Sequence, residues 1–511
     1  MPLLVKSPRG NHVIDLDKVE QILAREEAAA VEEDARLPAW AIVREEAVII
    51  MKLGVPMFVP NTALAIMVGH VTGAEESAEV LAAFNLSNMV QSLFVLFLVN
   101  GVDSAVSTLC AQAFGGKRMV EFWLFCQAAL IASAAGVLFV LAVMLSGASV
   151  LEWFGQDPAI SALAGAFLAV STVGVPFSVV YTVVLCVLLT QNITLPSVVS
   201  SAVSWSVSCA AAYLLAYHTS LGYLGVAMAA PICSVMKTLT LTPVVLRSEA
   251  FARSWPGWKP AEAMALVPTV AKLGLSSAFM VTFQNLSVTT TALLAGLLSS
   301  SGVMITASNI YISTIQLSYM PLLGVMVGGA IRIGNALGAG QARRAALLSR
   351  MVVVGTVAVA LVITAVTGFA AEPYASAFTP DQEVVGVAVG LLRELLAVIP
   401  FMGFTLAAQF IMRACGKQLL NAKLNFATML VVGVPLSWLF GMELRGGVAG
   451  LWFGNLLGLI LFAVLATAWL YQLSWEKFAH EAKHNTHLRF KEEERQAPPP
   501  PHNGAPTPDA F

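Results

Sequence analysis

The chain has 511 residues, of which 58% are hydrophobic and only 11% are charged, with a formal net charge of −2. Soluble globular domains carry charges at about 25% of their positions, so this composition excludes an ordinary water-soluble domain. The charged residues gather in the first 52 positions, in the last 37 and in short clusters between long apolar runs. No basic tract interleaved with aromatic residues is present, which argues against nucleic-acid binding.

The six cysteines form no C-x-x-C pair and no spacing typical of a metal site, so we expect neither a metal nor a cofactor. The first 46 residues are hydrophilic and include the acidic run Glu32-Glu33-Asp34. A cleaved signal peptide would place an apolar run there instead. The first membrane span is therefore expected to direct the chain into the bilayer.

Twelve apolar segments are long enough to cross a bilayer. A span needs about 20 mostly apolar residues, and a helix satisfies its own backbone polar groups in hydrocarbon. We therefore predict an all-α membrane protein. In chain order the segments lie near 48–70, 80–107, 122–148, 160–188, 194–217, 222–246, 267–298, 303–331, 348–371, 385–411, 420–440 and 447–472.

The basic residues predict the orientation, because lysine and arginine accumulate in short loops on the cytoplasmic side. With a cytoplasmic N-terminus, thirteen basic residues fall in cytoplasmic connections and only Arg445 falls in an outer one. Both termini are therefore predicted to be cytoplasmic, which also supports an even number of spans. The thirteen are Lys117, Arg118, Arg247, Arg253, Lys259, Lys272, Arg332, Arg343, Arg344, Arg350, Arg413, Lys417 and Lys423.

The chain also repeats itself at an offset of 220 to 224 residues. A near-constant offset through half the chain indicates duplication of a six-helix unit. Because six is even, both copies have the same polarity, a design found in transporters that bind substrate near the midplane between the repeats. The matches are Lys52-Leu53-Gly54 with Lys272-Leu273-Gly274, Asp157 with Asp381, Val175-Pro176-Phe177 with Ile399-Pro400-Phe401, and Gly225-Val226-Ala227 with Gly447-Val448-Ala449.

This duplication divides the chain into five parts. Residues 1–46 form a cytoplasmic N-terminal segment and residues 47–247 an N-terminal six-helix lobe. A cytoplasmic inter-lobe loop covers 248–265, and a C-terminal six-helix lobe covers 266–473. Residues 474–511 form a cytoplasmic tail, which its charged and proline-rich composition predicts to be disordered.

Three motifs stand out at the ends of spans. Span two ends in 107–116, STLCAQAFGG, and span eight ends in 332–340, RIGNALGAG. Their small residues permit close helix approach and their glycines end the helices. The third motif, Gly155-Gln156-Asp157-Pro158, is typical of a helix start.

Together with Tyr319-Met320-Pro321 in span eight, Val68-Gly69-His70 and Leu81-Ala82-Ala83, these motifs resemble the multidrug and toxic compound extrusion (MATE) family, particularly its eukaryotic branch. The resemblance covers about residues 45–472. It implies a twelve-helix, two-lobed antiporter that exports small organic compounds in exchange for protons or sodium ions. We expect a monomer in the plasma membrane or in a vacuole-like organelle membrane.

The sequence departs from the family pattern at its carboxylates. Where members of this branch carry a glutamate in span seven, this chain has Gln284, followed by Asn285. The other family acids fall at Thr289, Ser107 and Ala336. An amide or hydroxyl side chain binds ligands by hydrogen bonds but does not exchange a proton near neutral pH.

Two acids remain within the predicted spans, Asp103 and Glu394, and both are candidates for ion coupling. Asp103 lies one helical turn before Ser107 and on the same face. Asp103 is alternatively an interfacial group that pairs with Arg332 or Lys237. Glu394 is alternatively a partner of Arg393 or another cation, or a carboxylate near the outer interface.

Two further sets of residues complete the prediction. Polar residues on spans two, seven, eight and ten are candidates for a substrate cavity, or alternatively hydrogen-bond between helices as packing contacts. They are Asn88, Gln91, Gln284, Asn285, Asn309, Gln316, Tyr319 and Gln409. The inner-end motif consists of Gln112, Gly115, Arg332, Asn335 and Gly338.

Other functions are weighed against the antiporter. A lipid or polysaccharide flippase would show extra spans and a strongly cationic cavity, whereas Arg332, Arg393 and Lys237 are the only intramembrane cations to consider. The sequence shows no H-E-x-x-H, no G-x-S-x-G and no paired intramembrane acids, so we do not expect an enzyme. The missing carboxylates leave open a family member that has lost ion coupling.

Overall fold

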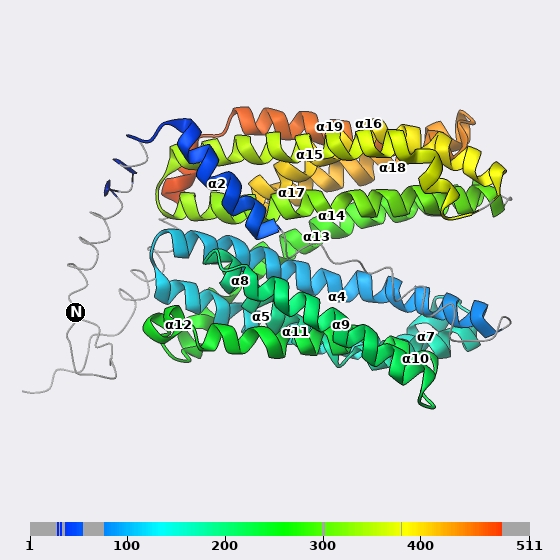
Figure 1. Ribbon diagram of the computed structural model, residues 1–511, viewed down its shortest axis with the longest axis horizontal. Coiled ribbons are helices and arrows are strands. Elements are labelled where there is room, and N and C mark those ends of the chain that lie inside the picture. Colours follow the sequence, from blue (N-terminus) through cyan, green and yellow to red (C-terminus); the bar gives the residue numbers. More distant parts are fainter. Residues whose placement is uncertain are drawn as a thin grey trace, which may run out of the picture.

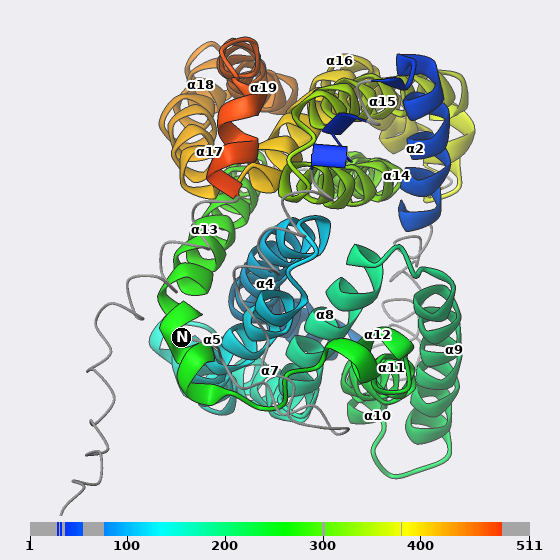
Figure 2. The same ribbon diagram turned by 90° about the vertical axis from the view of Figure 1, so that its left-hand side faces the viewer.

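The computed structural model describes residues 28–29, 31–32, 36–54, 76–298, 302–379 and 381–482. Its helices form two roughly parallel groups along the long axis of the molecule (Figure 1). We call residues 36–254 the N-terminal half and residues 260–471 the C-terminal half. Figure 2 shows the two groups end-on, with α13 (Pro260–Leu298) reaching from one group to the other.

The N-terminal half contains ten helices within the described ranges, the last of which leads into the connection to α13. They are α2 (Ala39–Gly54), α4 (Glu76–Gly115), α5 (Met119–Leu145), α6 (Gly147–Trp153), α7 (Pro158–Ser171), α8 (Gly174–Thr190), α9 (Leu195–Tyr217), α10 (Tyr223–Ala227), α11 (Ala229–Leu246) and α12 (Glu249–Ser254).

The C-terminal half begins with α13 and continues with three long helices, an irregular span and a final long helix. These are α14 (Gly302–Gly338), α15 (Ala342–Ser376), α16 (Gln382–Ala414), α17 (Gln418–Asn425), the π-helix η2 (Phe426–Gly433), α18 (Val434–Trp438), the π-helix η3 (Leu439–Glu443) and α19 (Gly447–Tyr471). A short helix at 475–482 follows.

The predicted membrane spans are confirmed wherever the chain is described. Ten helical segments are long and apolar enough to cross a membrane, and the pair α7 and α8, bent by 44°, makes an eleventh. These coincide in order with the second to twelfth predicted spans. The first predicted span, 48–70, lies mostly outside the described residues, and only its beginning is seen, in α2.

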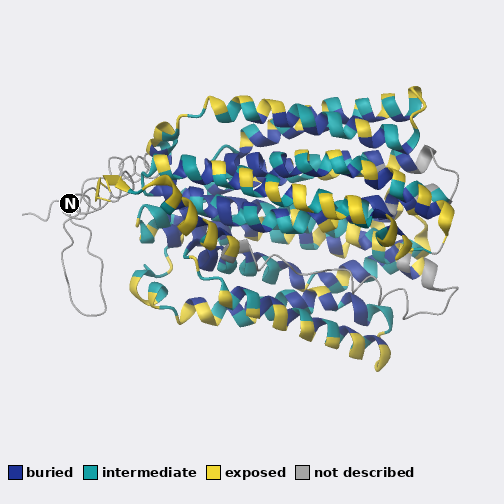
Figure 3. Ribbon diagram, turned by 45° about the horizontal axis from the view of Figure 1, so that its top comes forward, coloured by how far each residue is buried: buried dark blue, intermediate teal, exposed yellow. Residues whose placement is uncertain are grey.

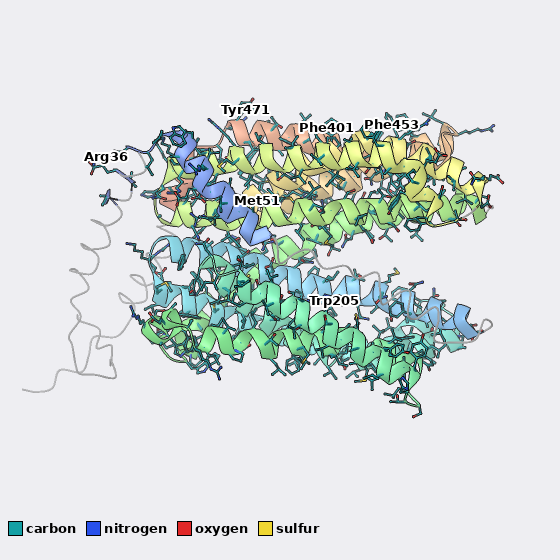
Figure 4. The ribbon with its side chains drawn as sticks, viewed as in Figure 1. Arg36, Met51, Trp205, Phe401, Phe453 and Tyr471 are labelled. Atoms are coloured by element: carbon teal, nitrogen blue, oxygen red, sulfur yellow. The ribbon has the colours of Figure 1, made fainter. Side chains whose placement is uncertain are left out.

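The outer surface of the bundle carries exposed apolar side chains, as expected of a surface that faces lipid. On α9 the serines at 197, 200, 201, 204 and 208 face inward and are buried, whereas Val199, Val203 and Val207 are exposed. This pattern is the reverse of a water-soluble amphipathic helix. Phe401, Phe453 and Tyr471 likewise point outward from the C-terminal half in Figure 4, and exposed positions run along the outer faces in Figure 3.

The duplication is visible in the helix boundaries. Met119 and Ala342 begin α5 and α15, and Leu195 and Gln418 begin α9 and α17, in both cases 223 residues apart. The two predicted aspartate turns are equivalent as well. The Asp157 side chain accepts hydrogen bonds from the backbone at the start of α7, and the Asp381 side chain does so at the start of α16.

The equivalent helices are not identical in shape. Pro176 lies just after the bend between α7 and α8, whereas α16 continues as one helix through Pro400. The regular helix α9 corresponds to a span in which π-helical turns flank Pro435. A proline removes one backbone hydrogen bond and obstructs the preceding turn, and each copy accommodates this differently.

The two halves exchange their first helical segments. Helix α2 packs against α14 and α15 of the C-terminal half, and α13 packs against α4 and α5 of the N-terminal half (Figure 2). Residues 52–54 and 272–274, matched in the sequence repeat, lie at the end of α2 and in the corresponding part of α13. The exchange ties the halves together near one end of the bundle.

The segments outside the predicted lobes are more ordered than expected. The tail from residue 474 was expected to be disordered, yet residues 475–482 form a helix that buries Ala479 and Ala482. The inter-lobe loop contains α12 and the beginning of α13. The N-terminal segment contains the first part of α2, which is covered by α14.

Candidate functional site

The ends of α4 and α14 cross with their backbones in direct contact. A Cβ atom on Gly115 would lie 1.9 Å from the carbonyl oxygen of Asn335, and one on Gly338 would lie 1.9 Å from the carbonyl oxygen of Gln112. No side chain fits at that distance, so glycine is required at both positions. The inner-end motif predicted from the sequence is therefore a single, symmetric crossing point between the two halves.

Two hydrogen bonds extend this symmetry. The Gln112 Nε2 atom donates to the carbonyl oxygen of Ala414 at 3.0 Å, and the Asn335 Nδ2 atom donates to that of Thr190 at 3.3 Å. Gln112 and Asn335 are equivalent in the repeat, and so are Thr190 and Ala414, the last residues of α8 and α16. In each half, therefore, a side-chain amide donates a hydrogen bond to the last carbonyl group of a helix in the other half.

An ion-pair cluster joins α2 to α14 and α15 beside this crossing. Glu46 is fully buried, and its carboxylate accepts hydrogen bonds from Arg332 at 2.6 Å and from Arg344 at 2.8 Å. Burial acts to raise the pKa of Glu46, but the hydrogen bonds and charges of the two arginines outweigh it and hold the pKa below its ordinary value. Glu46 is therefore ionised at neutral pH.

A second ion pair joins the halves through the coupling candidate Asp103. Arg413, at the end of α16, donates to the Asp103 carboxylate at 2.5 Å and to the Ser107 hydroxyl. The partner is therefore Arg413, and the alternatives Arg332 and Lys237 were wrong. Asp103 keeps 35% of its side chain exposed, and Tyr319 lies close enough to interact electrostatically with both charges.

The helix at 475–482 adds contacts at the same end. Arg118 donates to the carbonyl oxygen of Ala482 at 3.3 Å. Lys417 pairs with Glu481 at 3.0 Å and lies 4.9 Å from the centre of the Phe478 ring. This helix therefore connects the loop after α4 with the loop after α16.

A polar cavity of about 450 Å³ lies beside the crossing. It is lined by the ends of α4 and α14, by Glu45 of α2, and by the cations Lys117, Arg332 and Arg344. We call the end of the bundle that carries these groups the basic end. Hydrogen bonds and ion pairs between the halves extend from Ser104, which pairs with Ser277, to this end.

Toward the opposite end the facing helices are exposed. Beyond Phe97, whose ring contacts that of Phe279 at 5.4 Å, the α4 side chains Leu96, Leu93 and Asn88 are exposed. The ribbons of α4 and α14 also separate progressively away from the basic end (Figure 1). The halves are thus closed at the basic end and apart at the other.

Most substrate-cavity candidates lie on α4, α13 and α14, the helices at which the halves contact each other. Asn88 and Gln91 lie on α4, Gln284 and Asn285 on α13, and Gln316 and Tyr319 on α14. Asn88, Asn285 and Gln316 are exposed, and the other three are partly buried. Asn309 is also on α14, but its side chain is outside the described set.

Gln409 and Glu394 lie elsewhere. Gln409 is buried inside the C-terminal half, where it donates to Asn425 and its backbone oxygen accepts from Asn421, so it is a packing residue. Glu394 is partly buried and lies near the buried Tyr311 of α14. Arg393 beside it is exposed, and no ion pair between the two is found among the described residues.

Glu46 and Arg413 are central here but were not singled out from the sequence. Glu46 was assigned to the hydrophilic N-terminal segment, although it shares a helix face with the buried Ile42 and Ile50. Arg413 was counted only as a loop charge, although it lies at the last turn of an apolar helix. Charge within an apolar helical face is the signal that would have found both.

A protein-family model that matches both halves shows which family the chain belongs to. The MatE family model matches residues 49–214 and 276–439, one match in each half. The chain belongs to the MatE family. Its duplicated six-helix plan and the closed crossing between the halves are thus features of a MATE protein.

Known relatives extend over most of this MATE chain. Multidrug and toxin extrusion protein 1 of Oryctolagus cuniculus is 26% identical over 453 residues, covering 87% of this chain and 78% of the relative. Protein DETOXIFICATION 31 of Arabidopsis thaliana is 26% identical over 430 residues, covering 82% of this chain and 79% of the relative.

Solved structures share the fold. The crystal structure of the eukaryotic MATE transporter AtDTX14 superimposes with a TM-score of 0.78 at 21% identity, covering 88% of this chain and 98% of that one. An outward-facing multidrug resistance MATE transporter superimposes with a TM-score of 0.74 at 18% identity, covering 85% and 95%. The chain is therefore a multi-pass membrane protein of a transporter family.

Proposed function

We propose that this protein is a secondary active antiporter that exports small organic compounds, including xenobiotics, by alternating access. The observation that carries the proposal is the symmetric closure at the basic end, away from which α4 and α14 diverge and carry exposed polar side chains (Figure 1). A substrate bound between two such halves is released when the closed end opens and the open end closes. The names of the multidrug and toxin extrusion relatives are consistent with this substrate class.

We propose that the basic end is cytoplasmic, with both termini on that side, because basic residues concentrate in its connections. In that orientation the structure is an outward-facing state, closed to the cytoplasm. The protein acts as a monomer, since the substrate path lies between the halves of one chain.

We propose that coupling uses Asp103 or Glu394. Protonation of Asp103 would remove the charge that holds Arg413 of the other half, and so would weaken the closed basic end relative to the open one. Glu394 offers a second titratable group inside the C-terminal half, beside Tyr311. Gln284 has no charge to neutralise and is assigned a role in substrate binding only.

Proton-gradient-driven transport in proteoliposomes tests this proposal. We expect a pH gradient to drive organic-solute transport, and Asp103→Asn together with Glu394→Gln to reduce the driven rate by about tenfold or more. Downhill exchange should persist in these variants because the substrate path is intact. Gln284→Glu, which adds an acid instead of removing one, should leave a folded protein with an altered ion dependence.

Two results would contradict the coupling scheme. Full proton-driven transport by the double variant would remove both acids from the mechanism. Wild-type transport that proceeds only down the substrate gradient would show instead a MATE protein that has lost ion coupling, the alternative left open by the residues at 107, 284, 289 and 336.

A further inference from the structure

Lys237 lies near the middle of a membrane-spanning segment of the N-terminal half and has no role in the mechanism above. Lys237 is the only charged residue of the span Tyr223–Leu246, which is formed by α10 and α11. It is partly buried. An ionisable side chain at this depth is costly to place in lipid and is retained mainly for function.

The lysine does not reach toward the nearer membrane surface. Side chains on a helix lean toward its N-terminus, and α11 ends at the basic end, so Lys237 leans toward the middle of the bundle. Its Nζ atom lies 5.4 Å from the centre of the Tyr181 ring on α8. The ammonium group is therefore held among helices, over an aromatic face.

Helix α9 supplies hydroxyl groups to the same place. Ser200 is hydrogen-bonded to Thr240 of α11 at 2.6 Å, and the neighbouring Ser201 is buried. One turn further along the same face, Ser204 is fully buried and its Oγ atom has no hydrogen-bond partner. An unpartnered buried hydroxyl is an available donor for an anion, and Ser204 lies one turn from Ser200, whose hydroxyl is 3.5 Å from the backbone oxygen of Lys237.

No carboxylate of the N-terminal half neutralises this charge. Between residues 47 and 247, the sequence has acids near the ends of helices and only Asp103 within a span. Asp103 is already paired with Arg413 of the other half at 2.5 Å. Lys237 is thus a net positive charge in an apolar region, and the hydroxyl groups around it do not cancel it.

We propose that Lys237, Tyr181 and the α9 serines form a binding site for the carboxylate of a small organic anion. The ammonium would pair with the carboxylate, the Ser204 hydroxyl would donate to it, and the Tyr181 ring would contact the hydrocarbon part. Within the antiporter function proposed above, on which this assignment of substrate class rests, the protein accepts organic monocarboxylates.

Direct binding of benzoate to the purified full-length protein in nanodiscs tests the site, with benzamide as the uncharged analogue and chloride as a competitor. We expect benzoate to bind and benzamide to bind at least about tenfold more weakly. Lys237→Gln and Lys237→Met should each weaken benzoate binding by about tenfold or more, while Lys237→Arg retains it. Lys272→Gln removes an exposed lysine of α13 and should leave binding unchanged.

Equal benzoate binding by wild type and the folded Lys237→Gln and Lys237→Met variants would overturn the site. Chloride binding as tightly as benzoate, at the same residue, would overturn the organic ligand and show an inorganic anion site. Because binding is measured without a gradient, a failure of proton coupling leaves this test intact. Conversely, driven transport without benzoate binding would overturn only the carboxylate site.

Discussion

Replacement of Gly338 by alanine is expected to lower transport by about 100-fold or more while the protein remains folded and inserted. The added Cβ atom would lie 1.9 Å from the carbonyl oxygen of Gln112, and neither backbone can yield without separating α4 from α14. The basic end would then fail to close, and one of the two states needed for alternating access would be lost. Transport into proteoliposomes, with size-exclusion and thermal unfolding as checks of folding, measures the effect.

Gly386→Ala is the matched control for this substitution. Gly386 lies on α16, and a Cβ atom there would meet nothing within 4 Å. The Gly386→Ala variant should transport as the wild type does, because the same methyl group is added where it meets no other atom. Normal transport by Gly338→Ala would show that the crossing of α4 and α14 is not part of the transport cycle.

Replacement of Arg413 by methionine is expected to shift the protein toward the state open at the basic end. The substitution leaves the Asp103 carboxylate without its partner while keeping an unbranched side chain at this position. Breaking a buried pair costs about 3–5 kcal/mol, and the 35% exposure of Asp103 lowers this to about 2 kcal/mol. That energy corresponds to about thirtyfold in the ratio of closed to open protein.

A double-mutant cycle with Asp103→Asn isolates the pair. In the Asp103→Asn background, Arg413→Met should change the closed-to-open ratio by much less, because no carboxylate is left to pair. Accessibility of a cysteine introduced at position 339, in the lining of the basic-end cavity, reports the ratio. Equal effects of Arg413→Met in both backgrounds would mean that Arg413 does not act through Asp103. It would then act through Ser107 or through the Phe410 ring, whose centre lies 5.4 Å from the Arg413 guanidinium carbon.

The spans and the duplication could be read from the sequence because both depend on local composition. Long apolar runs predict helices that satisfy their own backbone in lipid, and the match of Asp157 with Asp381 is a local helix-cap signal. The small residues of the two inner-end motifs were likewise predicted to permit close helix approach, and their glycines to end the helices, as Gly115 and Gly338 do. The sequence did not show that these residues meet in one reciprocal contact, because that contact depends on the angle between the two halves.

The partners of the charged groups could not be read from the sequence. Asp103 pairs with Arg413, 310 positions away, because the halves meet at the ends of α4 and α16. Glu46 belongs to the exchanged segment α2, whose position against α14 is not encoded by hydropathy. Gln409 has the polarity of a cavity residue, but Asn421 and Asn425 of the same half satisfy it.

Paired distances at the two ends of the bundle test the central claim, that the halves alternate about this closure. Spin labels at Val120 and Lys423 would report the basic end, and labels at Trp153 and Phe378 the opposite end, since all four side chains are exposed. The account predicts that, on adding a transported solute or lowering the pH, a longer basic-end distance appears together with a shorter opposite-end distance. Distances that stay fixed at both ends, or that lengthen together, would contradict it.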